Sequence, residues 1–185
     1  MKKRCLVFSG PSGVGKSTLV NFVLNNFDSV GTTVSCTSRP PRASEKNGVE
    51  YYFISKEEFD ERVKNGEFIE HVELYGNKYG TLKTAVSDIL KDKDLCILDL
   101  DFEGAYNILS NNLIPNFKVE GILVLPLSIK SLKTRLMNRR TETEEEIQRR
   151  LDESFNAKKI ASYKHIIFNN DLEVAKAEIS KILQN

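Results

Sequence analysis

The chain has 185 residues, of which 40% are apolar, 29% charged and 9% aromatic, and its formal net charge is +1. This length suits one domain with a small insertion, and it allows a hydrophobic core without disulfides or metal ions. The balanced charge argues against a general nucleic-acid binder, and no apolar stretch of the sequence reaches the ~18 residues of a membrane span. We therefore expect neither nucleic acid nor a membrane as a partner.

Cysteines and arginines narrow the class of protein further. The three cysteines lie in apolar stretches without a CxxC pair, which is typical of reduced thiols and predicts a cytoplasmic protein. Seven of the nine arginines fall within 39–42 and 135–150, whereas the lysines are scattered. Arginine is suited to bidentate phosphate contacts, so two local anion sites predict an anionic small molecule as the ligand.

Short apolar runs alternate with helical patterns along most of the chain. The runs predict strands at 5–8, 33–36, 95–100, 121–125 and 165–168. The last three are continuous, as expected of parallel strands buried on both faces. Helical spacing of apolar residues predicts helices at 15–26, 82–91, 104–110, 129–137, 144–160 and 172–183. The fold class is therefore α/β, with a central parallel sheet flanked by helices.

The first strand is followed by a glycine-rich loop that opens the first helix. The loop fits G-x-x-x-x-G-K-[ST] and consists of Gly10, Pro11, Ser12, Gly13, Val14, Gly15, Lys16 and Ser17, with Thr18 next. Glycines let consecutive backbone N–H groups turn around a phosphate, and the helix N-terminus adds a favourable dipole. Lys16 suits the β- and γ-phosphates of a nucleoside triphosphate, and Ser17 suits Mg²⁺. The sequence thus predicts a P-loop NTPase core.

A P-loop predicts triphosphate binding but not the reaction. A GTPase needs a guanine-reading N-K-x-D sequence, and the nearest match, at 77–80, ends in Gly80 instead of aspartate. The chain is also too short for most motor or helicase arrangements. A small-molecule kinase is the class that remains.

Segment 37–81 interrupts the alternation of strands and helices. Short alternating runs occur at 51–54, 68–72 and 75–79, and the last of them contains a turn signal. This pattern predicts a small, mostly antiparallel β subdomain inserted after the second core strand.

A second anion site is predicted where this segment begins. Arg39 and Arg42 flank a stiff Pro-Pro pair, which limits the entropy that the loop loses on binding. Tyr51 and Tyr79 are phenolic donors suited to the same phosphate. A surface loop with solvated arginines has the same composition and is the alternative.

Glu70 is the candidate base reader. A carboxylate accepts two parallel hydrogen bonds, and guanine presents N1–H and N2–H₂ side by side, whereas adenine presents an acceptor at N1. Glu70 would therefore select guanine. A solvated glutamate on a strand is the alternative.

The apolar strand predicted at 95–100 ends in two acids, Asp99 and Asp101. A Walker-B-type aspartate at this place orients Mg²⁺ or its water, and Asp99 is our first candidate for the metal, together with Ser17. An aspartate that caps the next helix is the alternative. The sequence leaves open which of the two acids contacts metal.

Segment 129–159 predicts an arginine-rich helical lid. Arg135 and Arg139 are four residues apart and share a helix face, and a capping-box pattern then begins a second helix with a narrow apolar stripe. Two helices with so small a core should move easily. For Arg149 and Arg150, ion pairs with glutamates one turn earlier are the alternative role.

Together these motifs resemble the guanylate kinase family, whose members transfer the γ-phosphoryl group of ATP to GMP with Mg²⁺. The resemblance spans almost the whole chain in the family's order, through segments 9–18, 34–42, 48–51, 68–70, 79–81, 98–101, 139–143 and 168–169. It implies a core of 1–33, 85–128 and 160–185, a GMP-binding subdomain of 34–84 and a lid of 129–159. The chain departs from the family pattern at Ser44, Glu103 and Arg140, where affinity or loop motion would be altered.

The resemblance also implies roles for single residues. The ATP site consists of residues 10–18 and Asn169, the latter near the adenine or ribose. The GMP site consists of the phosphate ligands Arg39, Arg42, Tyr51 and Tyr79, the guanine readers Ser35, Glu70, Thr81 and Asp101, and also Asp99. The catalytic set is Lys16, Arg42, Arg135, Arg139 and Arg150.

The expected reaction is direct in-line transfer to a phosphate oxygen of GMP, and of dGMP as a second acceptor. That oxygen is already ionised, so the reaction needs no general base, and the cationic residues offset the repulsion between phosphates. Two alternatives are a catalytically silent guanylate-kinase-like interaction domain and a P-loop kinase for another phosphorylated small molecule. We expect a monomer or a weak homodimer.

Overall fold

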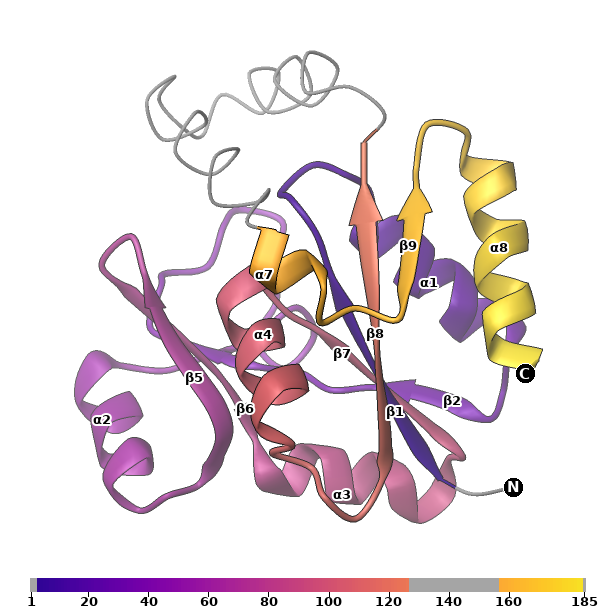
Figure 1. Ribbon diagram of the computed structural model, residues 1–185. Coiled ribbons are helices and arrows are strands. Elements are labelled where there is room, and N and C mark those ends of the chain that lie inside the picture. The colour runs from indigo at the N-terminus through magenta and orange to yellow at the C-terminus, as the bar shows by residue number, and fades with distance from the viewer. Residues whose placement is uncertain (1–2, 127–156, 185) are drawn as a thin grey trace.

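The computed structural model describes residues 3–126 and 157–184. Within these ranges the core sheet is parallel throughout and has the order β2-β7-β1-β8-β9 (Figure 1). Its strands are β1 (Arg4–Ser9), β2 (Val30–Thr32), β7 (Leu95–Asp99), β8 (Lys118–Leu125) and β9 (His165–Phe168). The predicted central parallel sheet is confirmed.

Helices cover both faces of the core sheet, because successive side chains of a buried strand point to opposite sides. Leu6 and Phe8 of β1 pack on the face of α1 and α8, whereas Cys5 and Val7 pack on the face of α3 and α4. The helices beside this core sheet are α1 (Lys16–Asn26), α3 (Lys83–Asp92), α4 (Phe102–Asn111), α7 (Ala157–Ile160) and α8 (Leu172–Gln184). Four predicted helices are thus confirmed, and of the helix predicted at 144–160 the structure describes only the last turn, α7.

The prediction of the second core strand was wrong. We expected it at 33–36, but the core strand is β2, which pairs with β7, and Cys36 already belongs to another sheet. Gly31 obscured the apolar pattern of β2. A Cβ atom at Gly31 would lie 2.7 Å from Cγ2 of Ile89, so this strand gives up a side chain to let α3 pack closely.

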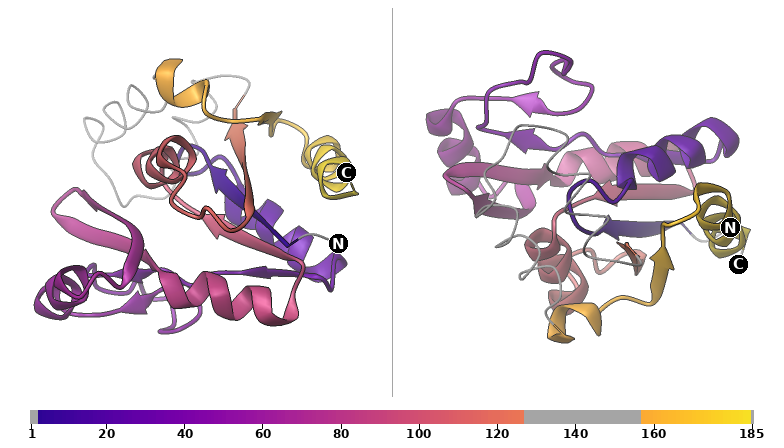
Figure 2. Two further views of the ribbon diagram at one scale, coloured as in Figure 1. Left: turned by 60° about the horizontal axis from the view of Figure 1, so that its bottom comes forward. Right: turned by 90° about the horizontal axis from the view of Figure 1, so that it is seen from above.

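A second sheet lies beside the core, in the order β4-β3-β6-β5. The pair β3–β4 is parallel and the other two pairs are antiparallel, which confirms the predicted small, mostly antiparallel β structure. Its strands are β3 (Cys36–Thr37), β4 (Tyr52–Phe53), β5 (Phe68–Leu74) and β6 (Asn77–Leu82). Figure 2 shows this sheet and α2 (Lys56–Lys64) at the end of the molecule far from α8.

Helix α2 was not predicted. Its first turn is capped by Ser55, whose hydroxyl accepts from the backbone N–H of Glu58 at 3.1 Å. Phe59 is its one buried residue and stacks on Phe68 of β5, with ring centroids 4.6 Å apart. The polar remainder hid the helix, although the serine and the glutamate three residues later formed a recognisable start signal.

Candidate functional site

The glycine-rich loop joins β1 to α1 at the carboxyl edge of the core sheet. Gly10, Gly13 and Gly15 have φ angles of 150°, 80° and 98°, a region that glycine adopts without strain. Gly10 also lies against β8, where a Cβ atom would come within 2.2 Å of the Val124 carbonyl oxygen. The motif glycines therefore serve both the turn and the close packing beneath it.

The cationic and hydroxyl groups of the loop lie at the start of α1. The ammonium group of Lys16 donates to the carbonyl oxygen of Gly10 at 2.7 Å, so it lies folded over the loop. Ser17 and Thr18 are exposed beside it. The end of β7 brings Asp99 near this lysine, and burial raises the pKa of the Asp99 carboxyl while Lys16 opposes that rise.

Asp101 has a structural task in the folded protein. Its Oδ1 accepts hydrogen bonds from the backbone N–H groups of Glu103 at 2.7 Å and Gly104 at 3.1 Å, and so caps α4. Burial raises the pKa of Asp101, and these hydrogen bonds oppose the rise. The helix-capping alternative that the sequence left open therefore describes Asp101, and its cap fixes the carboxylate at the cleft.

Glu70 is buried, with 6% of its surface exposed, so the alternative of a solvated glutamate was wrong. Its Oε1 accepts a hydrogen bond from the Thr81 hydroxyl at 2.9 Å, and that hydroxyl lies 3.1 Å from the Ser35 hydroxyl. Burial raises the pKa of Glu70 to about 7, the charge of Asp101 adds to the rise, and the Thr81 hydrogen bond opposes it.

Two structural features determine the position of the Glu70 carboxylate. The ladder between β5 and β6 has an irregularity between Phe68 and Glu70, which turns the strand at this point. On the other side lies Gly104 of α4, where a Cβ atom would be 2.6 Å from Glu70 Oε2. The helix approaches the carboxylate this closely only because residue 104 has no side chain.

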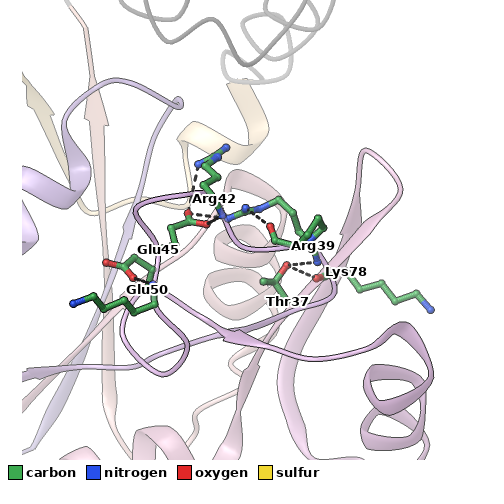
Figure 3. Close-up of polar contacts among 8 residues, drawn as sticks. Thr37, Arg39, Arg42, Glu45, Glu50 and Lys78 are labelled. Carbon is green, nitrogen blue, oxygen red and sulfur yellow. Dashed lines mark hydrogen bonds and ion pairs between the residues drawn. The ribbon is translucent and has the colours of Figure 1, made fainter.

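The predicted phosphate arginines lie in the loop between β3 and β4 (Figure 3). The guanidinium carbon of Arg39 lies 5.7 Å from the ring centroid of Tyr51, and the rings of Tyr51 and Tyr79 meet edge to face at 6.0 Å. Burial raises the pKa of Tyr51 to about 12, so the phenol keeps its proton and remains a donor at neutral pH. Arg39 and Arg42 both contact Glu45, a residue that sequence reasoning missed.

One cleft of about 660 Å³ joins the glycine loop, the aspartates, Glu70 and the arginines. Among the predicted residues in the described ranges, those on its wall are Gly10, Pro11, Ser12, Gly13, Gly15, Lys16, Ser17, Thr18, Ser35, Arg39, Arg42, Tyr51, Glu70, Tyr79, Asp99 and Asp101. Thr81 and Val14 do not line the cleft: Thr81 contacts its wall through the hydrogen bond to Glu70, and Val14 packs its side chain into the core. The fold thus brings together residues from both sheets that lie far apart in the sequence.

Comparison with known proteins identifies the family. The sequence model of the guanylate kinase family matches residues 2–185. The chain belongs to the guanylate kinase family. Transfer of the γ-phosphoryl group from ATP to GMP is the activity of that family.

Individual relatives agree with this assignment over most of their length. The chain is 40% identical to a guanylate kinase of Clostridioides difficile (strain 630), over 97% of this chain and 86% of the relative. It is also 40% identical to a guanylate kinase of Homo sapiens, over 97% of this chain and 92% of the relative. The crystal structure of guanylate kinase from Anaplasma phagocytophilum superposes with a TM-score of 0.76 at 30% identity, covering 99% of this chain and 85% of that one.

The family resemblance assigns Asn169 to the nucleotide. In the structure its side chain contacts the P-loop. It is buried, and its side-chain amide donates to the carbonyl oxygen of Val14 at 2.8 Å. A Cβ atom at Gly15 would come within 2.4 Å of the same amide nitrogen. Asn169 therefore stabilises the loop through its contact with Val14.

Other parts of the expected guanylate kinase site lie outside the described residues. These are Arg135, Arg139, Arg150 and most of the predicted lid, together with the Arg140 departure. The Glu103 departure is described: its carboxylate forms an ion pair with Lys159 of α7, and both side chains border the cleft. The lysine was not predicted, because no local pattern links two residues so far apart in the sequence.

Within residues 3–126 and 157–184, no helix combines the length and the apolar character needed to cross a bilayer.

Sequence reasoning also missed Glu73, Leu74 and Tyr75, which reach the cleft from the hairpin between β5 and β6. The turn there uses Tyr75 and Gly76 with φ angles of 54° and 72°. The predicted turn signal was right, but the strand begins two residues later than expected.

Proposed function

We propose that this chain is an active guanylate kinase that transfers the γ-phosphoryl group of ATP to GMP, and to dGMP, giving ADP and the corresponding diphosphate. The observation that carries the proposal is the single cleft in which an intact P-loop faces a buried carboxylate and two arginines. A triphosphate cradle alone fits many P-loop proteins. The addition of a guanine reader and a monophosphate site restricts the acceptor.

Glu70 supports the choice of guanine over adenine. Its carboxylate is anchored by Thr81 on one oxygen and is otherwise walled in by Gly104, so it presents a fixed acceptor edge. Guanine offers two donors to such an edge, whereas adenine would leave a buried carboxylate facing its N1 acceptor. Ser35 and Asp101 line the same cleft and belong to the proposed base site.

The proposed mechanism is in-line attack by a GMP phosphate oxygen on the γ-phosphorus of ATP. The attacking oxygen is ionised at neutral pH, so the protein has to position it and to offset charge. Lys16 would contact the donor phosphates, and Arg39 and Arg42 the acceptor phosphate. Arg135, Arg139 and Arg150 remain predicted partners of the transferred group. We further propose that the segments 34–84 and 129–159 close over the core to exclude water.

The residues of the cleft fit a magnesium ion. The Ser17 hydroxyl and the Asp99 carboxylate both border the cleft beside Lys16, and one or two protein oxygens completed by phosphates and waters are what Mg²⁺ prefers. Bound there, the ion would neutralise charge on the donor phosphates. Asp101, which caps α4, is the less suitable ligand.

A coupled assay of ADP release with GMP, dGMP, AMP, CMP and UMP tests the proposal. We expect turnover with GMP and dGMP and little with the others. Lys16→Ala should abolish transfer while circular dichroism and the melting temperature stay close to those of the parent protein. Folded protein that turns over none of the five would favour the silent interaction domain, and a preference for another acceptor would favour a different P-loop kinase.

A further inference from the structure

Glu45 lies between the two arginines of the proposed phosphate site (Figure 3). Its Oε1 accepts a hydrogen bond from Nη2 of Arg39 at 2.9 Å and lies 3.7 Å from Nη1 of Arg42. Its Oε2 accepts from the backbone N–H of Arg42 at 2.7 Å. One carboxylate therefore holds both arginines, one through its side chain and the other through its backbone.

The carboxylate is a fixed negative charge in this site. Its side chain is 11% exposed. Burial by itself would raise the pKa of Glu45, but the hydrogen bonds from Arg39 and Arg42 and their charges hold it below its ordinary value. Glu45 is consequently ionised at neutral pH, and its charge offsets the repulsion between two guanidinium groups directed to one region.

The contacts of Arg39 indicate which arginine this charge organises. Besides the bond to Glu45, Nη1 of Arg39 donates to the Pro40 carbonyl oxygen at 2.8 Å, and its guanidinium carbon lies 5.7 Å from the ring centroids of both Tyr51 and Phe53. The Arg39 side chain is 15% exposed, against 52% for Arg42. Arg39 is therefore fixed before a ligand arrives, whereas Arg42 is tied mainly through its backbone.

We propose that Glu45 is a positioning residue for the acceptor phosphate: it orients Arg39 and anchors the Arg42 backbone so that both guanidinium groups face one phosphate. The inference rests on the proposed function, because that phosphate is the one carried by GMP. The opposite role is that of a competitor, because a carboxylate between two arginines competes with an incoming anion. The two roles predict opposite signs for the loss of its charge.

Glu45→Gln separates the two roles, because the amide oxygen still accepts from a backbone N–H while the charge is lost. If Glu45 positions Arg39, the KM for GMP should rise about tenfold, as for the loss of one charge-assisted hydrogen bond. The KM for ATP should stay within twofold. An unchanged or lower KM for GMP would overturn the proposal.

Glu50→Gln is the matched control. Glu50 lies in the same loop, and its Oε2 accepts from the backbone N–H of Lys46 at 2.7 Å, the same kind of bond that Glu45 makes with Arg42 (Figure 3). Its substitution removes a charge and keeps an oxygen that accepts from the backbone N–H, without touching an arginine, so the KM for GMP should stay within twofold. An equal effect of both variants would assign Glu45 a merely structural role.

A double-mutant cycle with Arg39→Ala distinguishes an effect of Glu45 through Arg39 from a general destabilisation of the loop. If Glu45 acts through Arg39, Glu45→Gln should have little further effect on the KM for GMP once Arg39 is absent, and additive effects would contradict the proposal. Glu45→Ala, measured in parallel, keeps the test open if the glutamine variant does not fold. Calorimetry of the parent protein with GMP separates the two failures: absence of binding refutes the proposed function, whereas binding that Glu45→Gln leaves unchanged refutes only this inference.

Discussion

Replacing Glu70 with glutamine should make the protein more stable and less active. In the folded protein, Glu70 is an acid whose charged form is disfavoured by burial and by the charge of Asp101. Glutamine keeps the shape of the side chain and an oxygen that accepts from the Thr81 hydroxyl, but it never ionises. The ionisation cost therefore disappears together with the acceptor edge proposed to read guanine.

The size and sign of the effect follow from linkage between proton binding and folding. The pKa of Glu70 is raised in the folded protein from 4.5 to about 7. At about 1.4 kcal/mol per pH unit, this difference corresponds to about 3 kcal/mol. The folded state binds the Glu70 proton more tightly than the unfolded state does. The contribution of this proton to the stability of the parent protein is therefore fully present below about pH 4.5 and is lost as the pH rises through 7. The gain from Glu70→Gln should thus be near its full size at pH 8 and small at pH 5.

Urea unfolding of the parent protein and of Glu70→Gln at pH 5 and pH 8 measures this effect. Glu73→Gln is the matched control, because Glu73 lies on the same strand with an exposed side chain. Its free energy of unfolding should follow that of the parent protein at both pH values. Glu70→Gln should also lower kcat/KM for GMP on the order of 10²-fold. A glutamine variant that is no more stable than the parent protein at pH 8 would refute the reasoning.

Three further results are expected. The KM for GMP of the parent protein should rise about tenfold between pH 8 and pH 6, because guanine needs ionised Glu70 with its pKa of about 7, and Glu70→Gln should lack this part of the pH profile. Gly104→Ala should raise the KM for GMP, but not that for ATP, because the new methyl group would meet the Glu70 carboxylate. Asn169→Ala should raise the KM for ATP about tenfold, but not that for GMP, because the Val14 carbonyl loses its donor, and it should cost about 1 kcal/mol in urea unfolding.

The parts of the site that the sequence predicted are those encoded locally. The P-loop could be found because its glycines, Lys16 and Ser17 lie in eight consecutive residues between a strand and a helix. The paired arginines could be found because a stiff loop contains both. In each case neighbouring residues determine the geometry, so the order of residues contains the information.

The parts that the sequence did not predict depend on contacts between distant segments. The burial of Glu70 results from α4, which crosses at Gly104, more than thirty residues further along the chain. The role of Asn169 depends on β9 ending beneath the P-loop. Glu45 lies three residues after Arg42, but nothing in a loop sequence tells a counterion of the phosphate site from a solvated glutamate.

The charges of the cleft are compensated differently on its two sides, so we expect the proposed substrates and cation to bind in concert. The phosphate arginines already have an internal anion, Glu45. On the other side, burial raises the pKa values of Glu70, Asp99 and Asp101, and Lys16 is an opposing charge near the two aspartates. Donors on guanine and a divalent cation would stabilise these three acids in their charged forms. Binding of the acceptor and of the metal–triphosphate complex should therefore each favour the other, because both relieve the same unfavourable burial of charge.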